Sequence, residues 1–424
     1  MRIGETSIVN DTQDQERRPQ GVVNEQAPQG AVNVEKWVYG GESLVRVDGR
    51  VVFAPYLLPG ETARLKIGKD VHAELIDVVT PSDARVDPPC RLFARCGGCH
   101  YQHAPYEFQL AQKVEILREQ LRRVGKIEYA GEIATISGPP LGYRNRAQFH
   151  VQDGRIGYLE ARSHTLVPLS GECPVASPKL NEALASLREK LRDPQFPRFV
   201  SSIELFTNET DVQVNIVESE KRVARWFFDW VGSTEILDYQ TAGGMFRVGG
   251  RSFFQVNRFL IDKLIEAAIG VSGDAESGVS GGSALDLYAG VGLFSVPLAK
   301  RFGEVVAVEA NQGASRDLEF NAERAGVAVK VEHARVEDFL APAHHTPGEF
   351  DFIVADPPRA GLGKSVTRRL AELAAPKMVI VSCDPATLAR DVAMLGDYEI
   401  EKLTLVDLFP QTYHMETVAE LRRR

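Results

Sequence analysis

Short apolar runs alternate with polar turns along the C-terminal half of the chain. Four runs have the length and composition of buried parallel strands, and they cover residues 284–288, 304–308, 350–355 and 378–381. A helix with an apolar face is expected over residues 258–269, before the first run. Strands that alternate with helical segments are typical of an α/β fold with a parallel sheet, which binds its ligands at the carboxyl ends of the strands.

The residues that follow these four runs carry candidate chemistry. The first run enters the glycine turn Asp286-Leu-Tyr-Ala-Gly-Val-Gly292, and the second ends at Glu309, whose carboxylate can accept hydrogen bonds from ribose hydroxyls. The third ends in Asp356-Pro-Pro-Arg-Ala-Gly361, and the fourth leads to Cys383, a thiol where a nucleophile would face the crevice. The glycine turn lacks the Gly-x-Gly-x-x-Gly pattern of dinucleotide enzymes and favours the shorter turn of methyltransferase-type sheets. The sequence therefore predicts a cofactor pocket that contains a nucleophile.

Shorter strands of alternating polarity predict a different structure in the N-terminal half. Residues 45–53 alternate around an Asp-Gly turn and indicate a β-hairpin, and residues 62–67 and 73–79 supply further strands. About five short strands in this region favour a small, OB-like β-barrel, a shape that often binds RNA but also serves as a structural accessory. A helix is expected over residues 106–124, followed by a mixed α+β pattern over 147–240.

These patterns divide the chain of 424 residues into four parts. They are a disordered leader (1–30), the β-barrel (31–82), a central α+β region (83–245) and the α/β domain (246–424). The formal net charge of −9 argues against broad wrapping of nucleic acid, although residues 85–146 are locally basic. The sequence has no apolar run long enough to span a membrane and no apolar signal core, so we expect a cytoplasmic protein. We also expect it to act as a monomer.

The cysteines indicate a metal centre. Four of the five have the spacing of a metal site, and they are Cys90, Cys96, Cys99 and Cys173. In a reducing compartment, a Cys-x2-Cys pair with two further thiols favours a metal over disulfides. Four thiolates suit zinc or a 4Fe–4S cluster, and the nearby His100 and His103 keep the zinc alternative open. Four unrelated buried thiols are the remaining alternative.

Five motifs together resemble the RNA uridine-C5 methyltransferases. They are Gln255-Val-Asn, the glycine turn at Asp286, Asp356-Pro-Pro-Arg-Ala-Gly-Leu362, Ser382-Cys-Asp-Pro-Ala-Thr-Leu-Ala-Arg-Asp391 and Phe409-Pro-Gln-Thr-Tyr-His-Met-Glu-Thr-Val418. The four-cysteine pattern matches the iron–sulfur branch of that family, and the N-terminal barrel resembles its TRAM domain. The resemblance extends from about residue 31 to the C-terminus. It implies a class I, Rossmann-like methyltransferase sheet, preceded by an α+β iron–sulfur region, that uses S-adenosylmethionine.

The resemblance also implies a role for each matched residue. Cys383 would be the nucleophile that adds to C6 of uracil, and Glu416 the base that removes the proton from C5. The positions that bind S-adenosylmethionine are matched by Gln255, Tyr288, Glu309 and Asp356. The positions that hold a 4Fe–4S cluster are matched by Cys90, Cys96, Cys99 and Cys173. Three positions depart from the pattern: Arg335, where relatives carry a short polar residue, Asp384, where many have Asn, and Pro358, where some have Ala.

The expected substrate is a uridine in RNA, which must leave its stack to enter the pocket. The barrel and the cysteine pattern together favour 23S ribosomal RNA over the T-loop of transfer RNA. Two other functions stay open. A base-nitrogen methyltransferase would share the acidic Pro-Pro turn but would not need Cys383, and a noncatalytic RNA-binding protein would need neither Cys383 nor Glu416.

Overall fold

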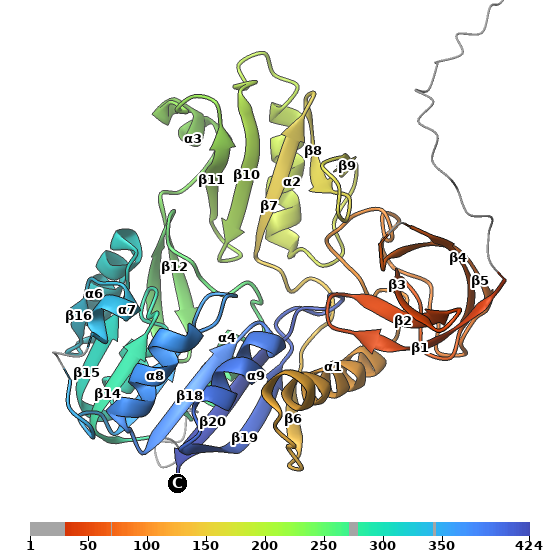
Figure 1. Ribbon diagram of the computed structural model, residues 1–424. Helices are drawn as coiled ribbons and strands as arrows, with labels where there is room; N and C mark the ends of the chain where they lie inside the picture. The colour runs from red at the N-terminus through yellow and green to blue at the C-terminus, as the bar shows by residue number, and fades with distance from the viewer. Residues whose placement is uncertain (1–29, 69, 271–278, 342–344) are drawn as a thin grey trace, which may run out of the picture.

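The computed structural model describes residues 30–68, 70–270, 279–341 and 345–424 (Figure 1). The predicted leader therefore lies outside the described residues, apart from Gly30. Within the described ranges, the strands form three sheets and one two-stranded ribbon. No helix in these ranges is long and apolar enough to cross a membrane.

The largest sheet has eight strands in the order β16-β15-β14-β17-β18-β20-β19-β6. Its strands are β6 (Ile133–Ile136), β14 (Gly281–Leu287), β15 (Phe302–Val308), β16 (Lys330–Glu332), β17 (Phe352–Ala355), β18 (Lys377–Ser382), β19 (Tyr398–Val406) and β20 (Glu416–Arg423). The strands from β16 to β18 are mutually parallel, whereas β20 runs antiparallel between β18 and β19. All four predicted parallel strands are present, so the predicted α/β fold is confirmed.

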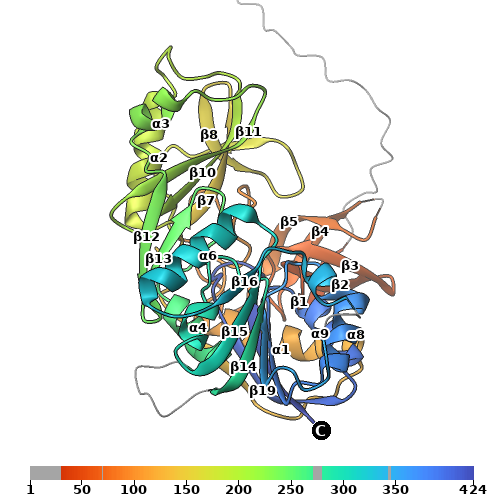
Figure 2. The ribbon, with the colours of Figure 1, turned by 90° about the vertical axis from the view of Figure 1, so that its left-hand side faces the viewer.

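Helices cover both faces of this sheet (Figures 1 and 2). They are α4 (Ile261–Ile269), α5 (Ser295–Leu298), α6 (Gln312–Ala325), α7 (Val336–Phe339), α8 (Gly363–Leu373) and α9 (Pro385–Met394). Alternate residues of a strand point to opposite faces. In β17, Ile353 and Ala355 belong to the core with α8 and α9, whereas Phe352 and Val354 belong to the core with α4. Because both faces are covered, β17 is apolar along its whole length.

The predicted helix over 106–124 is confirmed as α1 (Tyr106–Gln120), which continues into a π-helical turn, η1 (Leu121–Gly125). Ile116 and Leu117 of α1 lie in the same core as α8 and α9. The short strand β6 then pairs with β19 and extends the large sheet. This part of the chain therefore belongs to the C-terminal sheet in space, and the predicted domain boundaries stay a prediction.

A second sheet of five antiparallel strands occupies the N-terminal part of the described chain. Its strands are β1 (Val32–Val38), β2 (Glu42–Val47), β3 (Arg50–Pro55), β4 (Thr62–Ile67) and β5 (Ala73–Thr80), in the order β3-β2-β1-β4-β5. The predicted hairpin is present, with Asp48 and Gly49 both at positive φ in its turn. The N–H of Phe53 donates to the carbonyl of Val71 at 2.8 Å, which brings β3 against the chain before β5 and closes the sheet on itself.

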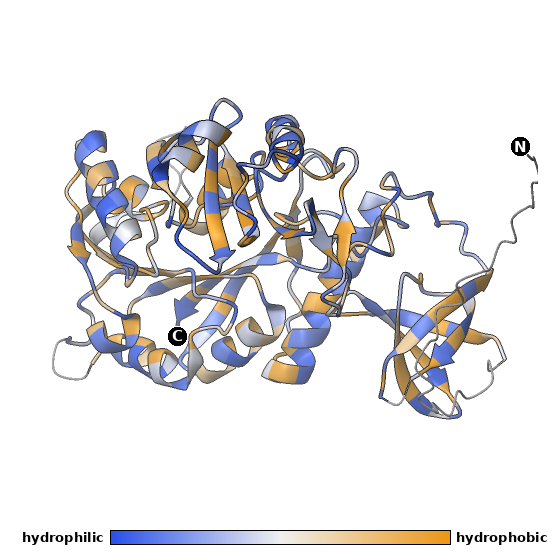
Figure 3. Ribbon diagram, turned by 90° about the horizontal axis from the view of Figure 1, so that it is seen from above, coloured by the Kyte–Doolittle hydropathy of each residue, from blue (hydrophilic) through white to orange (hydrophobic). Residues whose placement is uncertain are grey.

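The third sheet lies between the other two in sequence and forms the upper part of Figure 1. It contains β7 (Arg146–Gln152), β8 (Arg155–Leu159), β9 (Leu166–Pro168), β10 (Val200–Thr207) and β11 (Val212–Ser219), with α2 (Pro178–Lys190), α3 (Arg225–Val231) and a ribbon of β12 (Ile236–Thr241) and β13 (Gly244–Gly249) beside it. Polar and apolar residues alternate along many strands of the molecule (Figure 3), as expected where one face of a strand is buried.

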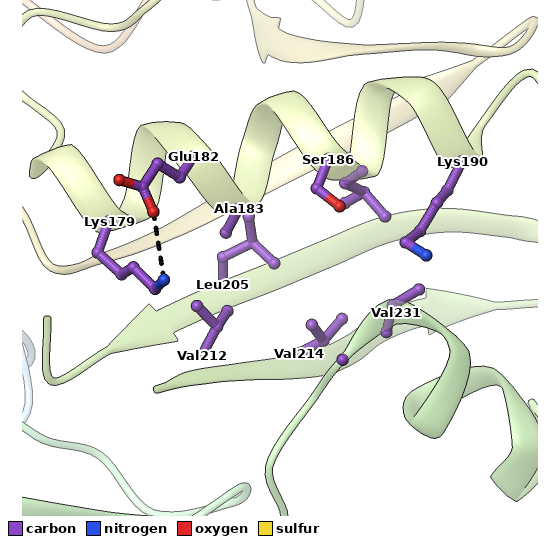
Figure 4. Close-up of a pocket in the computed structure, with 11 residues that line it drawn as sticks. Lys179, Glu182, Ala183, Ser186, Lys190, Leu205, Val212, Val214 and Val231 are labelled. Carbon is purple, nitrogen blue, oxygen red and sulfur yellow. Dashed lines mark hydrogen bonds and ion pairs between the residues drawn. The ribbon is translucent and has the colours of Figure 1, made fainter. Parts of the chain in front are cut away.

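A groove runs between α2, β10, β11 and the end of α3 (Figure 4). Its apolar floor is formed by Leu205, Val212 and Val214, and the ammonium of Lys179 at its rim is paired with Glu182 at 3.2 Å. None of its lining residues belongs to the C-terminal sheet. It is therefore not the pocket in which the predicted chemistry would occur.

Candidate active site

Polar side chains follow the carboxyl ends of four parallel strands along one edge of the C-terminal sheet. The residues directly after β14, β15, β17 and β18 are Tyr288, Glu309, Asp356 and Cys383. The antiparallel strand β20 begins at this same edge with Glu416, because its register pairs the start of β20 with the end of β18. Five of the predicted site residues, contributed by five strands, therefore share one edge.

Cys383 is half-buried among charged groups. Burial raises the pKa of its thiol to about 12, and the carboxylates of Glu416, Asp356 and Asp384 act in the same direction. The guanidinium of Arg359 opposes them. Arg359 was not among the predicted site residues. Its position in the acidic Pro-Pro turn, three residues after Asp356, is the sequence feature that could have indicated it. At neutral pH the thiol of the free protein therefore holds its proton.

Three carboxyl groups at this edge also have raised pKa values. Glu416 is 4 % exposed, and its Oε1 has no hydrogen-bond partner in the described part of the chain. Burial and the neighbouring Asp356 raise the pKa of Glu416 well above its ordinary value. Desolvation raises the pKa of the partly exposed Asp356 to about 7. It also raises the pKa of the buried Asp286, which accepts a hydrogen bond from Ser295, to about 7. Perturbed carboxyls beside a thiol are typical of sites that carry out chemistry.

Glu309 is fixed at the glycine turn. Its Oε2 accepts a hydrogen bond from the N–H of Gly290 at 2.9 Å, and its Oε1 accepts one from the N–H of Asn311 at 2.6 Å. Tyr288 and Gly290 have φ values of 62° and 57°, so the chain turns sharply through the left-handed region just after β14. Each carboxylate oxygen keeps a free lone pair, which allows Glu309 to accept further hydrogen bonds from a ligand.

Gln255 comes from another part of the chain, the connection between β13 and α4. It is 5 % exposed. The N–H of Asn145 donates to the carbonyl of Val256 at 3.0 Å, and the side-chain amide of Asn257 donates to the carbonyl of Leu408 at 3.2 Å. The first bond fastens the Gln255 segment to the chain just before β7, and the second fastens it to the loop that leads into β20.

The loop between β19 and β20 is held by a buried ion pair that was not predicted from the sequence. The ammonium of Lys113 on α1 lies 2.6 Å from Asp407 Oδ1, and both side chains are inaccessible to water. The same ammonium donates to the carbonyls of Phe409 at 3.1 Å and His414 at 2.8 Å, and the hydroxyl of Tyr106 donates to Asp407 Oδ2 at 2.9 Å. The available signal was a lysine in a predicted helix at a position spaced for burial, where lysine is rarely found unpaired.

The three departures from the family pattern have different surroundings. Asp384 caps α9, because its Oδ1 accepts hydrogen bonds from the N–H groups of Ala386 at 3.0 Å and Thr387 at 2.8 Å. Arg335 and Pro358 are both exposed.

The four clustered cysteines converge in space, although the last is distant in sequence. One small, partly open cavity is lined by Cys90, Cys96, Cys99 and Cys173, with Arg144 and several apolar side chains. Burial raises the pKa of Cys96 to about 11 and that of Cys99 to about 12. Across the described ranges, no group of three or more His, Cys, Asp or Glu residues is arranged to hold a metal ion. Neither His100 nor His103 lines this cavity.

The fold and the edge of the C-terminal sheet define a class of protein. A parallel sheet with a short glycine turn after one strand and an acidic residue after its neighbour is the arrangement of class I, S-adenosylmethionine-dependent methyltransferases. The sequence model of the tRNA (Uracil-5-)-methyltransferase family matches residues 200–424.

Proteins named as RNA methyltransferases are similar to this chain over most of its length. An uncharacterized RNA methyltransferase of Aquifex aeolicus is 33 % identical and covers 92 % of this chain and 97 % of its own length. The 23S rRNA (uracil(1939)-C(5))-methyltransferase RlmD of Halomonas elongata is 33 % identical and covers 91 % of this chain and 88 % of its own. The structure of the Pyrococcus abyssi tRNA (uracil-54, C5)-methyltransferase in complex with S-adenosyl-L-homocysteine has a TM-score of 0.70 at 26 % identity and covers 92 % of this chain and 100 % of that one. The chain therefore belongs to the tRNA (uracil-5-)-methyltransferase family and is an S-adenosylmethionine-dependent RNA methyltransferase.

Proposed function

We propose that the protein transfers a methyl group from S-adenosylmethionine to C5 of a uridine in 23S ribosomal RNA, through a covalent bond between Cys383 and C6 of the uracil. The observation that carries the proposal is the position of the Cys383 thiol beside the buried Glu416 carboxyl at the ligand-binding edge of the sheet. A base-nitrogen methyltransferase has no use for this thiol, and a noncatalytic RNA-binding protein has no use for either group.

Covalent addition overcomes the weak nucleophilicity of uracil C5. The thiol of Cys383 gives its proton to solvent, and the resulting thiolate adds to C6, which moves the electrons of the C5–C6 double bond onto C5 and O4. Bound S-adenosylmethionine supplies the methyl group that C5 acquires. Glu416 then accepts the remaining proton from C5, the C5–C6 double bond forms again, and the sulfur leaves C6 as a thiolate. The free side chain of Cys383 is thus restored at the end of each catalytic cycle.

The protonation state of the free site sets the expected pH dependence. The pKa of Cys383 is raised to about 12, so its thiol is neutral at pH 7 before substrates bind, and burial raises the pKa of Glu416 well above its ordinary value. Both must be deprotonated at their own steps. We therefore expect the rate of methyl transfer to rise as the pH increases above about 7.

Four residues are proposed to bind S-adenosylmethionine, and they are Gln255, Tyr288, Glu309 and Asp356. Glu309 would accept hydrogen bonds from the ribose hydroxyls with the lone pairs that its two backbone contacts leave free. Replacing Glu309 by Ala should weaken binding of the methyl donor by at least about tenfold, because charge-assisted hydrogen bonds are lost. Calorimetric titration with S-adenosylhomocysteine measures this change.

The choice of 23S ribosomal RNA rests on relatives that bear that name at 31 to 33 % identity. Transfer RNA is the alternative, since the structural neighbour at 26 % identity is named for uracil 54 of tRNA. We also propose that the closed N-terminal sheet contributes to RNA binding as a TRAM domain, and that the enzyme acts as a monomer in the cytoplasm. Mass mapping of 5-methyluridine in RNA from cells with and without this gene separates the substrates. Loss of one 5-methyluridine from 23S RNA supports the proposal, and loss from the T-loop supports the alternative.

We further propose that the four clustered cysteines hold a 4Fe–4S cluster. The four cysteines line one small, mainly apolar cavity, and four thiolates are the usual ligands of such a cluster. The two histidines that would suit zinc lie outside the cavity lining, which favours a cluster over zinc. Anaerobically purified protein should contain about four iron and four sulfide ions per chain. One zinc ion and no iron would support the alternative.

The function is tested with purified protein and a 23S RNA transcript. Wild-type protein should form 5-methyluridine, whereas Cys383→Ala should form none. Tyr129→Phe is a control, because Tyr129 lies in the connection before β6 and its hydroxyl donates a hydrogen bond to the carbonyl of Glu132 at 3.3 Å, away from the active edge. Methylation by Cys383→Ala at the rate of the control would contradict the covalent route and favour base-nitrogen chemistry.

A further inference from the structure

The N-terminal sheet reaches the active edge of the C-terminal sheet through the side chain of Tyr39. Tyr39 stands directly after β1, and its hydroxyl donates a hydrogen bond to Asp384 Oδ2 at 3.0 Å. We propose that Tyr39 is a positioning residue of the methyltransferase site, which holds Asp384 and thereby fixes the turn that carries the Cys383 thiol. The inference rests on the proposed role of Cys383 and extends the site to the N-terminal sheet.

The turn around Cys383 is fixed from both of its sides. Asp384 Oδ1 caps α9 by accepting from the N–H groups of Ala386 and Thr387. The hydroxyl of Ser382 donates to the carbonyl oxygen of Asp384 at 3.0 Å. Because Oδ1 is bound to α9 and Oδ2 to Tyr39, the orientation of Asp384 depends on both the helix and the N-terminal sheet.

The ring of Tyr39 also contacts the loop that carries Glu416. The centroids of the Tyr39 and Tyr413 rings lie 5.6 Å apart at 86°, which is the favoured edge-to-face arrangement. Tyr413 lies in the loop that leads into β20, three positions before Glu416, the first residue of that strand. One side chain therefore touches both the turn of the proposed nucleophile and the loop of the proposed base.

Buried neighbours hold Tyr39 in place. Trp37 lies two positions earlier in β1, is 2 % exposed, and stacks on Tyr101 with the ring centroids 4.0 Å apart. Gly41 follows at φ +88°, and a Cβ atom at that position would lie 2.8 Å from the ring of His100. The chain approaches this ring too closely for a larger residue, so glycine is required there.

The hydroxyl of Tyr39 is a permanent donor, because burial and then the charge of Asp384 raise its pKa far above its ordinary value. The titratable and charged groups that face the thiol or Asp384 come from four places in the fold and are Tyr39, Tyr413, Glu416, Asp356 and Arg359. Asp384 itself raises the pKa of the thiol. Its replacement by Asn keeps a helix cap and a partner for Tyr39 but removes this charge.

Three full-length variants test the proposal. Tyr39→Phe removes only the hydroxyl, and Asp384→Asn removes only the charge. Tyr398→Phe is the matched control, because the hydroxyl of Tyr398 is also buried but donates to the carbonyl of Ala375 at 2.8 Å, at the opposite end of the sheet. One measurement is alkylation of Cys383 by iodoacetamide in the free protein at increasing pH, followed by peptide mass spectrometry. The other is the rate of covalent adduct formation with 5-fluorouridine-containing 23S RNA at saturating RNA and methyl donor.

Tyr39→Phe should slow adduct formation by about tenfold, with RNA affinity within about twofold of wild type, and should move the alkylation profile to higher pH. Asp384→Asn should move that profile to lower pH and keep adduct formation within about threefold of wild type. Tyr398→Phe should change neither measurement. An unchanged rate and profile for Tyr39→Phe would overturn the proposal, as would equal slowing by Tyr398→Phe. If wild type forms no adduct, the proposed function fails, while the alkylation profiles still decide the role of Tyr39.

Discussion

Replacing Lys113 by Met tests whether the loop that carries Glu416 depends on a buried charge pair. The ammonium of Lys113 and the carboxylate of Asp407 lie 2.6 Å apart with no exposure to water. At that separation and an effective dielectric constant of about 20, their attraction is about 6 kcal/mol, which offsets part of the cost of burying both charges. Burial still lowers the pKa of Lys113, although Asp407 acts in the opposite direction. Without the lysine, the Asp407 carboxylate keeps one partner among the described residues, the hydroxyl of Tyr106. Removing one partner of such a pair costs about 3–5 kcal/mol.

The measurement is the free energy of unfolding in urea, with Lys300→Met as control. Within the described part of the chain, Lys300 donates one hydrogen bond, to the carbonyl of Gly243 at 2.9 Å, so its loss should cost no more than about 1.5 kcal/mol. The double variant Lys113→Met/Asp407→Leu should recover most of the loss, because it removes the unpaired buried charge. If Lys113→Met lowered the free energy of unfolding by less than about 1 kcal/mol, the loop would not depend on this pair, because breaking a buried pair costs several times more.

Three further outcomes are expected. Glu416→Gln should accumulate the covalent complex with ordinary uridine-containing RNA, visible as a slowly migrating band, because the C5 proton is not removed; absence of the band would contradict the role of Glu416. Cys173→Ser should lose bound iron, measured by metal analysis, and unchanged iron would contradict the cluster. Asp286 has a pKa of about 7 when folded and an ordinary one near 4 when unfolded, so its stability contribution falls as the pH rises through that window. In urea unfolding, the stability of Asp286→Asn relative to wild type should therefore increase by up to about 1.4 kcal/mol for each pH unit from about pH 4 to pH 7. The same difference in the free energy of unfolding at pH 4 and at pH 7 would contradict this.

The C-terminal sheet was predictable because its parallel strands are buried on both faces and therefore read as continuous apolar runs. Their carboxyl ends must share one edge, which is why the sequence alone placed Glu309, Asp356 and Cys383 together. The strand β6 was not predicted, because it has only four residues and belongs to the sheet solely through its pairing with β19. Local pattern does not reveal such a distant partner.

The contacts that support the site were missed for a related reason. Lys113 and Asp407 are 294 positions apart, and Tyr39 and Asp384 are 345 apart, so no spacing rule joins them. A buried lysine or tyrosine hydroxyl needs a partner, but its sequence neighbours do not say which one. The motif around Cys383 indicated the chemistry, whereas the residues that hold this motif in place became visible only in the folded chain.

The most direct test of the central claim is peptide mapping of the complex formed with 5-fluorouridine-containing 23S RNA and S-adenosylmethionine. With fluorine at C5 there is no C5 proton for the base to remove. The covalent intermediate between Cys383 and the uracil should therefore persist. We expect the RNA-derived mass on the peptide that contains Cys383 and no adduct with Cys383→Ala. A wild-type protein that binds this RNA and the methyl donor but carries no adduct at Cys383 would contradict the account.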